Sequence, residues 1–221
     1  MNIEQARFNM IEQQIRPWDV LDQSVLSLLA LVKREDFVPA AQKALAFVDT
    51  EVPLPVLKGE GQCMLAPKVE ARLLQELAVQ KHESVLEIGA GSGHMAALLG
   101  HKAQQVHSLE IDAELAQMAR ANLRRAGVVN VNVLNVDGAQ GLAAEAPFDV
   151  IVLSGSVAEV PAVLLAQLKL GGRLVAIVGQ SPIMRATLFT HSSPNDFSRV
   201  ELFDTVAPRL RGFDEPSRFK F

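Results

Sequence analysis

The sequence is poor in residues that cross-link a chain or anchor it in a bilayer. It has one cysteine, one tryptophan and no tyrosine. A single cysteine, Cys63, cannot form a disulfide within the chain, which is typical of proteins in a reducing compartment. No apolar run is long enough to span a bilayer, and the charged N-terminus lacks the apolar stretch of a signal peptide. These absences predict a soluble cytoplasmic protein with no membrane partner.

Neither sign of charge dominates the chain. The formal net charge is −4 over 221 residues, of which 21% are charged and 49% hydrophobic. Nothing in this balance favours binding to nucleic acid or to an anionic membrane. The length suits one domain, or one domain with an appended subdomain. The histidines other than His94 show no metal-ligand spacing, so no metal site is expected, and the oligomeric state stays open.

The first 80 residues differ in pattern from the rest. Apolar residues recur at helical spacing over residues 3–14 and 22–32, with Pro17 between the two segments. A proline- and glycine-rich loop is predicted over residues 50–61, followed by a helix over residues 67–77. We therefore expect residues 1–80 to form a cap of helices with a substrate-side loop.

From residue 84 onward, strand and helix patterns alternate. Strands are predicted over residues 84–89, 105–111, 130–136, 148–155, 171–179 and 199–206, and helices over residues 94–100, 113–127 and 161–168. Repeated βα units indicate an α/β fold: a doubly wound, mostly parallel sheet with helices on both faces. Residues 81–221 are thus predicted to form a Rossmann-like core.

A glycine-rich turn links the first predicted strand to the first helix of this core. Residues 85–93 read Val-Leu-Glu-Ile-Gly-Ala-Gly-Ser-Gly. Gly89, Gly91 and Gly93 permit a tight turn and let the backbone approach a ligand without obstruction by a Cβ atom. In such sheets, ligands bind at the carboxyl ends of the strands, which is where this turn falls.

Acidic residues follow the next two predicted strands. Glu110 lies 21 residues after Gly89, where a carboxylate can accept hydrogen bonds from both hydroxyls of a ribose. Asp137, followed by Gly138, ends the third predicted strand. Glu87 lies inside the first strand, near the turn, where an acid can complement a cationic ligand.

The ordered set of glycines and acids distinguishes between nucleotide cofactors. A dinucleotide site favours glycine at position 94, which is histidine here, so a nicotinamide cofactor is disfavoured. The order of Glu87, three alternating glycines, Glu110 and Asp-Gly resembles class I methyltransferases, which implies S-adenosylmethionine as the cofactor. The candidate cofactor residues are Glu87, Gly89, Ala90, Gly91, Ser92, Gly93, Glu110, Ile111, Asp137 and Gly138.

Further segments carry a closer resemblance. In order, they are KREDFVP (33–39), PLPVLKGEGQ (53–62), VLEIGAGSGH (85–94), NVDG (135–138), APFDVIVLSG (146–155) and GGRLVAIVG (171–179). With these segments, the chain resembles the protein-L-isoaspartate O-methyltransferase family over roughly Met10 to Phe213. The resemblance implies N-terminal helices over the mouth of the active site. It also implies carboxyl methylation of isoaspartyl residues in proteins or peptides.

The chain departs from this family on the substrate side. Where the family has Thr-Ile-Ser-Gln-Pro, this sequence has Cys-Met-Leu-Ala-Pro, with Cys63 at the threonine position and Leu65 at the serine position. A leucine side chain cannot donate a hydrogen bond. Cys63, Leu65 and Ser154 are the candidates for positioning the acceptor, although a lone cysteine is also common as a small buried apolar residue.

Several alternatives stay open. The enzyme could methylate a different acceptor, and a hydroxyl or amine acceptor would need a general base, for which His94 is the candidate. The chain could also bind S-adenosylmethionine without catalysis. Trp18 is predicted to anchor the N-terminal helices to the sheet. The tail arginines could contact an acidic peptide or simply be exposed: Arg209, Arg211 and Arg218.

Overall fold

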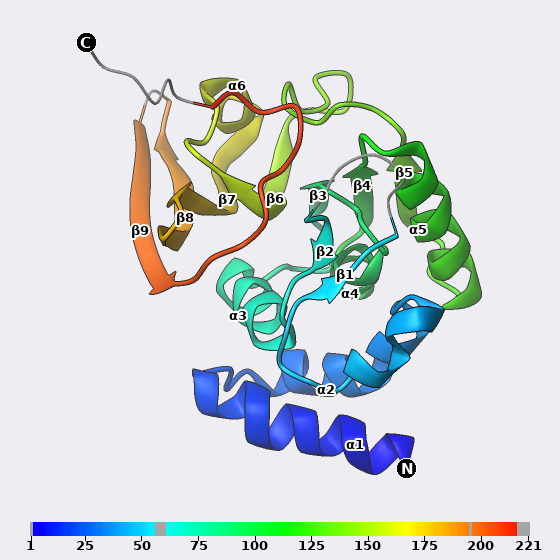
Figure 1. Ribbon diagram of the computed structural model, residues 1–221. Coiled ribbons are helices and arrows are strands. Elements are labelled where there is room, and N and C mark those ends of the chain that lie inside the picture. Colours follow the sequence, from blue (N-terminus) through cyan, green and yellow to red (C-terminus); the bar gives the residue numbers. More distant parts are fainter. Residues whose placement is uncertain (1, 56–60, 195, 216–221) are drawn as a thin grey trace.

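The computed structural model describes residues 2–55, 61–194 and 196–215. Its centre is a seven-stranded sheet with the strand order β5-β4-β3-β6-β7-β8-β9 (Figure 1). The strands are β3 (Ser84–Ile88), β4 (Gln105–Leu109), β5 (Val131–Leu134), β6 (Phe148–Val157), β7 (Leu168–Gln180), β8 (Ile183–Ser193) and β9 (Asp196–Asp204). The five strands from β5 to β7 pair in parallel, whereas β8 and β9 are antiparallel. The predicted mostly parallel sheet is confirmed.

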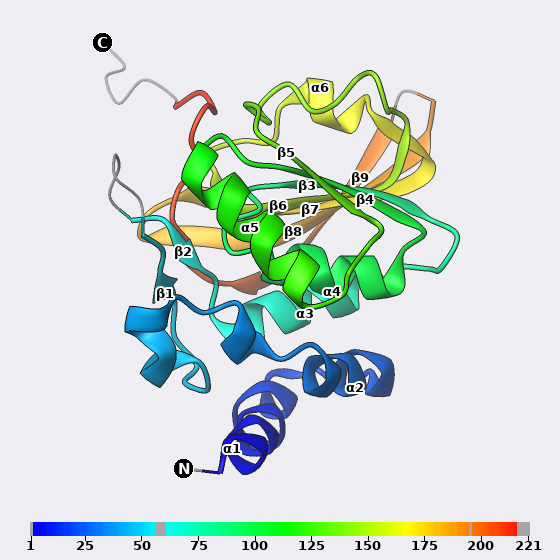
Figure 2. The ribbon, with the colours of Figure 1, turned by 90° about the vertical axis from the view of Figure 1, so that its right-hand side faces the viewer.

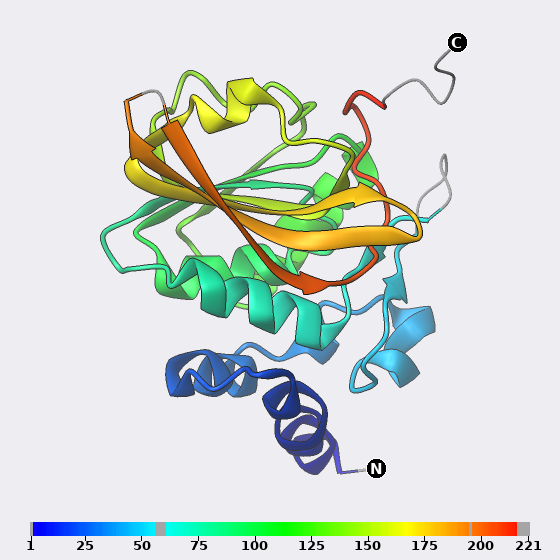
Figure 3. The same cartoon turned by 90° about the vertical axis from the view of Figure 1, so that its left-hand side faces the viewer.

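Helices cover one face of the sheet much more fully than the other. The helices are α1 (Ile3–Met10), α2 (Gln23–Leu31), α3 (Pro67–Leu77), α4 (His94–Lys102), α5 (Ala113–Arg125) and α6 (Ala162–Leu165). Figures 2 and 3 show α3, α4 and α5 against one face, with α1 and α2 forming a further layer beneath α3 and α4. The opposite face carries the four-residue α6 and irregular segments. Helices were expected on both faces of the sheet. One face carries α3, α4 and α5, whereas the other carries only the short helix α6.

The N-terminal segment folds as its sequence pattern predicts. The predicted first helix begins as α1 and widens into a π-helical segment over Ile11–Ile15, which a short 3-10 helix containing Pro17 ends. Asp22 caps α2, because its Oδ1 accepts a hydrogen bond of 2.7 Å from the amide of Ser24. Residues 56–60 of the predicted loop lie outside the described residues.

The cap and the sheet share one apolar core. Buried residues from α2, α3, β3 and β6 belong to the same cluster, among them Leu29, Leu74, Val85 and Val152. The division of the chain near residue 80 stays a prediction. The ring of Trp18 meets Lys68 of α3, whose Nζ lies 3.9 Å from the ring centroid. This contact joins two N-terminal elements, and the expected anchoring of Trp18 to the sheet stays a prediction.

Sequence patterns missed one strand of the seven-stranded sheet and overextended one helix. β8 lies between β7 and β9, but its polar threonines hide the apolar alternation; Thr187 is fully buried and donates to the carbonyl of Arg185. The predicted helix over residues 161–168 shortens to α6, because Leu168 already begins β7. Across the described residues, none of the helices has the length and apolar character needed to cross a membrane.

Gly93 and Gly127 both have a positive φ angle, but only Gly93 has close neighbours where a Cβ would be added. Gly93 has φ +83°, and a Cβ there would lie 3.2 Å from the backbone of Ala119 in α5. Gly127 has φ +71° with nothing within 4 Å of a Cβ. We expect Gly127→Ala to lower the free energy of unfolding by about 1 kcal/mol and Gly93→Ala by about 2–4 kcal/mol, because overpacking adds to the backbone cost. Urea denaturation of both variants measures this difference. Equal losses of unfolding free energy would contradict the prediction and show that α5 can move away from the added Cβ at no energetic cost.

Candidate active site

Backbone and side-chain hydrogen bonds hold the glycine turn (residues 89–93) in place. The amide of Gly89 donates to the carbonyl of Leu109 at 2.8 Å, and the amide of Gly93 to that of Ala90 at 2.7 Å. The carbonyl of buried Ser92 accepts from Nδ2 of Asn122 in α5 at 2.8 Å. These bonds hold the turn between β3 and α4. Its three glycines adopt positive φ angles, which side chains with a Cβ rarely do, and they form the tight turn that the sequence predicted.

A buried acid lies directly below the glycine turn. Glu87, in β3, is fully buried and accepts hydrogen bonds from Ser108 and, at 2.9 Å, from Oγ of Ser154. Burial raises the pKa of Glu87 to about 7. Among the described residues, no basic side chain forms an ion pair with it. The site thus contains an acid that a cationic ligand would stabilise in its ionised form.

The second predicted acid supports the turn from the side. Glu110 accepts from the amide of Gly91 at 2.8 Å and from the amide of Asp112 at 3.0 Å. Burial also raises the pKa of Glu110. Each carboxylate oxygen keeps a lone pair, so the carboxylate can accept further bonds from a pair of hydroxyls. Ile111, beside it, is half-buried.

The third predicted acid lies against the C-terminal strap, which we define as residues 207–213. Oδ1 of Asp137 accepts from the amide of Ala139 at 2.9 Å, and a Cβ at Gly212 would lie 2.4 Å from that oxygen. A Cβ at Gly138 would lie 2.5 Å from Ile88, so that position requires glycine. Asp137 therefore lies against the strap, and the neighbouring Gly138 lies against β3.

The strap crosses the carboxyl ends of the strands. The amide of Leu210 donates to the carbonyl of Ser156 at 2.9 Å, and the amide of Ser156 donates to the carbonyl of Pro208 at 2.8 Å. The side chain of Leu210 overlies Gly89, where an added Cβ would meet it at 2.8 Å. Figure 1 shows this segment in red, running beside β6. These residues, APRLRGF, are the segment whose sequence only loosely matches the family's substrate-side arm.

A narrow cavity joins the substrate-side segment to the glycine turn. Its volume is ≈ 20 Å³, and its lining residues are Cys63, Met64, Leu65, Glu70, Glu87, Gly89, Ala90, Gly91, Ser92, His94, Met95 and Ser154. All three acceptor-positioning candidates line it, together with five of the cofactor candidates. The other cofactor candidates lie outside this lining: Gly93, Glu110, Ile111, Asp137 and Gly138. A larger cavity of ≈ 480 Å³ opens between the strap and the segments that follow Gly138 and β6.

The substrate-side segment is held by a short hairpin. Strands β1 (Val52–Pro53) and β2 (Cys63–Met64) pair antiparallel and bring Cys63 to the cavity. Burial raises the pKa of the Cys63 thiol, and the nearby carboxylate of Glu51 raises it further. The thiol is therefore neutral, which excludes a thiolate nucleophile at neutral pH. The side chain of Leu65 is buried in the wall.

A buried ionic network joins this segment to the start of α4. Arg34 forms an ion pair with Glu70 of α3, and its Nη2 donates to the carbonyl of Leu65 at 2.8 Å. Nδ1 of His94 lies 3.0 Å from Oε2 of Glu70. Burial alone would raise the pKa of Glu70, but His94 and Arg34 outweigh it and lower the pKa. Sequence reasoning missed Arg34 and Glu70, although Arg34 lies in the KREDFVP segment and Glu70 interrupts an apolar helix face.

The tail arginines are engaged within the chain. Arg209 donates to the carbonyl of Gly179 at 2.9 Å and pairs with Glu215, and Arg211 pairs with Asp112 at 3.5 Å. Arg218 lies outside the described residues. In the described ranges, no group of three or more His, Cys, Asp or Glu side chains is placed to hold a metal ion.

A parallel sheet with a glycine turn after β3, a buried acid below that turn and a second acid after β4 defines an S-adenosylmethionine-dependent methyltransferase with a Rossmann-like fold. The family profile described as Protein-L-isoaspartate(D-aspartate) O-methyltransferase (PCMT) matches residues 5–202. The chain belongs to this family.

Individual relatives agree with this assignment. A protein-L-isoaspartate O-methyltransferase of Koribacter versatilis is 39% identical over 90% of this chain and 87% of the relative. One from Rhodopseudomonas palustris is 40% identical over 92% of both chains. A solved protein-L-isoaspartate O-methyltransferase is 26% identical with a TM-score of 0.73, covering 92% of this chain and 66% of the other. A Plasmodium falciparum structure in complex with S-adenosyl-L-homocysteine, 20% identical with a TM-score of 0.73, shows the same fold.

The raised pKa of Glu87 predicts pH-dependent cofactor binding. Because S-adenosylmethionine is cationic, it favours the ionised carboxylate. Its affinity should therefore hold above about pH 7 and fall by up to about tenfold per pH unit below it. Glu87→Gln should weaken binding at pH 8 and flatten the profile. Calorimetric titration across pH measures both effects. Glu83→Gln, at the opposite end of β3, is the control and should keep the wild-type profile; a flat wild-type profile would contradict the prediction.

Proposed function

We propose that this protein transfers the methyl group of S-adenosylmethionine to the side-chain carboxyl group of isoaspartyl residues in proteins or peptides. The observation that carries the proposal is the single cavity in which Glu87 and the glycine turn meet the substrate-side residues Cys63, Leu65 and Ser154. Membership of the protein-L-isoaspartate O-methyltransferase family supports this choice of acceptor.

The residues of the site fit the cofactor. Glu87 is a buried acid without a basic partner among the described residues, and so suits a ligand that carries positive charge. Gly89 and Gly91 of the glycine turn are half-buried and line the cavity, and Glu110 keeps acceptor capacity for ribose hydroxyls. Asp137 and Gly138 would complete the site along the strand ends. When bound, S-adenosylmethionine supplies an electrophilic methyl group on a sulfonium.

The chain's own residues serve mainly to orient the acceptor. An isoaspartyl carboxylate is ionised at neutral pH, since its reference pKa is about 4, so no general base is needed. The reaction then depends on holding the carboxylate oxygen in line with the methyl group, and such positioning can contribute up to about 10 kcal/mol. Arg34 fixes the backbone at Leu65, and Glu87 fixes the hydroxyl of Ser154. The buried walls at Met64, Leu65 and Met95 keep water away.

Transfer of radiolabelled methyl to an isoaspartyl peptide tests the proposal, with the matching aspartyl peptide as control. We expect base-labile label on the isoaspartyl peptide alone, because a carboxyl methyl ester hydrolyses in base. Calorimetric binding of S-adenosylmethionine is measured in parallel. Cofactor binding without label on either peptide would contradict the proposed acceptor, and would leave a methyltransferase with another acceptor or a non-catalytic binding protein.

A further inference from the structure

The cavity lacks an obvious donor for the carboxylate that the proposed function places there. Leu65 has no polar side-chain atom. The hydroxyl of Ser154 donates its hydrogen to Glu87 at 2.9 Å. The thiol of Cys63 is a weak donor; its burial and the nearby Glu51 raise its pKa. A carboxylate entering between these side chains would need a stronger partner, because a buried charge without hydrogen bonds is costly.

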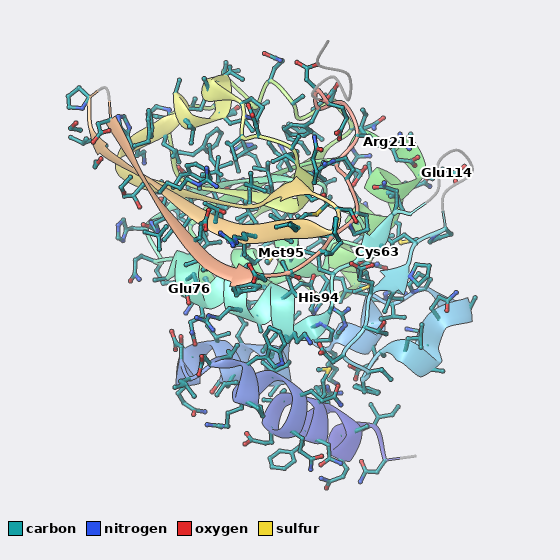
Figure 4. The ribbon with its side chains drawn as sticks, turned by 60° about the vertical axis from the view of Figure 1, so that its left-hand side comes forward. Cys63, Glu76, His94, Met95, Glu114 and Arg211 are labelled. Atoms are coloured by element: carbon teal, nitrogen blue, oxygen red, sulfur yellow. The ribbon has the colours of Figure 1, made fainter. Side chains whose placement is uncertain are left out.

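One residue that lines this cavity has a buried polar atom without a hydrogen-bond partner. His94 lines the cavity and is 3% exposed, and its Nε2 has no hydrogen-bond partner among the described residues. Figure 4 labels His94 and Cys63 between the sheet and the N-terminal helices, and both line this cavity. Since buried polar atoms in native proteins are nearly always bonded, an unpaired ring nitrogen at a ligand cavity calls for an explanation.

The surroundings of His94 fix the state of the other ring nitrogen. Glu70 is ionised, because Arg34 and His94 lower its pKa, so its Oε2 can only accept. Two acceptors would repel at the 3.0 Å that separates Oε2 from Nδ1, so the hydrogen is on Nδ1. Nη1 of Arg34, 3.4 Å from Nδ1, already donates to Glu70. Phe37 packs against the ring edge-on, with centroids 5.3 Å apart, and restricts its rotation. Nε2 then carries a lone pair and can only accept in the neutral ring, whereas in the imidazolium it carries a hydrogen and donates.

We propose that His94 binds the acceptor carboxylate through Nε2–H as an imidazolium, supplying the donor that Leu65 lacks. The inference rests on the proposed function. The charges balance, because Arg34 offsets Glu70 and the imidazolium offsets the substrate carboxylate. The ionisable groups facing the ring are Arg34 and Glu70, and Cys63 and Glu87 share the cavity. Because the neutral ring has no hydrogen on Nε2, binding as the imidazolium takes up a proton from solvent, and the peptide KM therefore rises with pH.

Two amide substitutions separate the two ring nitrogens. The amide of asparagine reaches the position of Nδ1, so His94→Asn keeps a bond to Glu70 but leaves nothing at Nε2. The amide of glutamine reaches the position of Nε2, so His94→Gln keeps an uncharged donor there. We expect His94→Asn to raise the isoaspartyl peptide KM about ten- to hundredfold. His94→Gln should recover part of that loss and abolish the rise of KM with pH.

The measurement is the isoaspartyl peptide KM and kcat of the three proteins across pH, with calorimetric Kd for S-adenosylmethionine and the unfolding midpoint recorded for each. A raised KM with a smaller change in cofactor Kd supports the proposal. An unchanged KM in His94→Asn, with a flat wild-type profile, would overturn it and leave the ring structural. A greatly reduced kcat with unchanged KM and a rate that rises with pH would overturn it in favour of a general base. Wild-type cofactor binding without any labelled peptide would overturn the proposed function itself, and the inference with it.

Discussion

The buried ion pair between Arg34 and Glu70 is the interaction on which the site depends. Arg34 is 2% exposed and Glu70 4%, so removing either partner would leave an uncompensated charge, typically at a cost of about 3–5 kcal/mol. Through its other bonds, the pair reaches the carbonyl of Leu65 and the ring of His94. The substrate-side segment and the first turn of α4 are thereby fixed to one point, although they are distant in sequence.

Glu87 stands in the opposite electrostatic situation. Arg34 and His94 hold the pKa of Glu70 low, whereas burial raises the pKa of Glu87 to about 7, with only hydroxyl donors opposing it. One buried acid is therefore compensated by the protein, and the other is left for a cationic ligand to compensate. Both acids line the same cavity. The difference assigns Glu70 to the framework of the site and Glu87 to ligand binding.

The features that sequence predicts best are those set by local geometry. The glycine turn, Glu110 and the parallel strands follow from short-range spacing, because a βα unit allows few alternatives. The Arg34–Glu70 pair could not be predicted in this way, because its residues are 36 positions apart in the sequence and the pattern around each gives no indication of its partner. The covering position of Leu210 depends on how the tail crosses the sheet. β8 was missed because Thr187 is polar yet buried.

The same network explains how this chain can carry leucine at position 65. Arg34 binds the backbone carbonyl of Leu65, not its side chain, so the segment keeps its place whatever side chain position 65 carries. Leu65 then contributes apolar burial to the cavity wall. Because Glu70 holds His94 beside the same cavity, the hydrogen-bond donor that a leucine at position 65 lacks can come from position 94 without moving the backbone. A divergent substrate side is therefore compatible with an unchanged cofactor side, since the ion pair that supports both does not depend on the side chain at position 65.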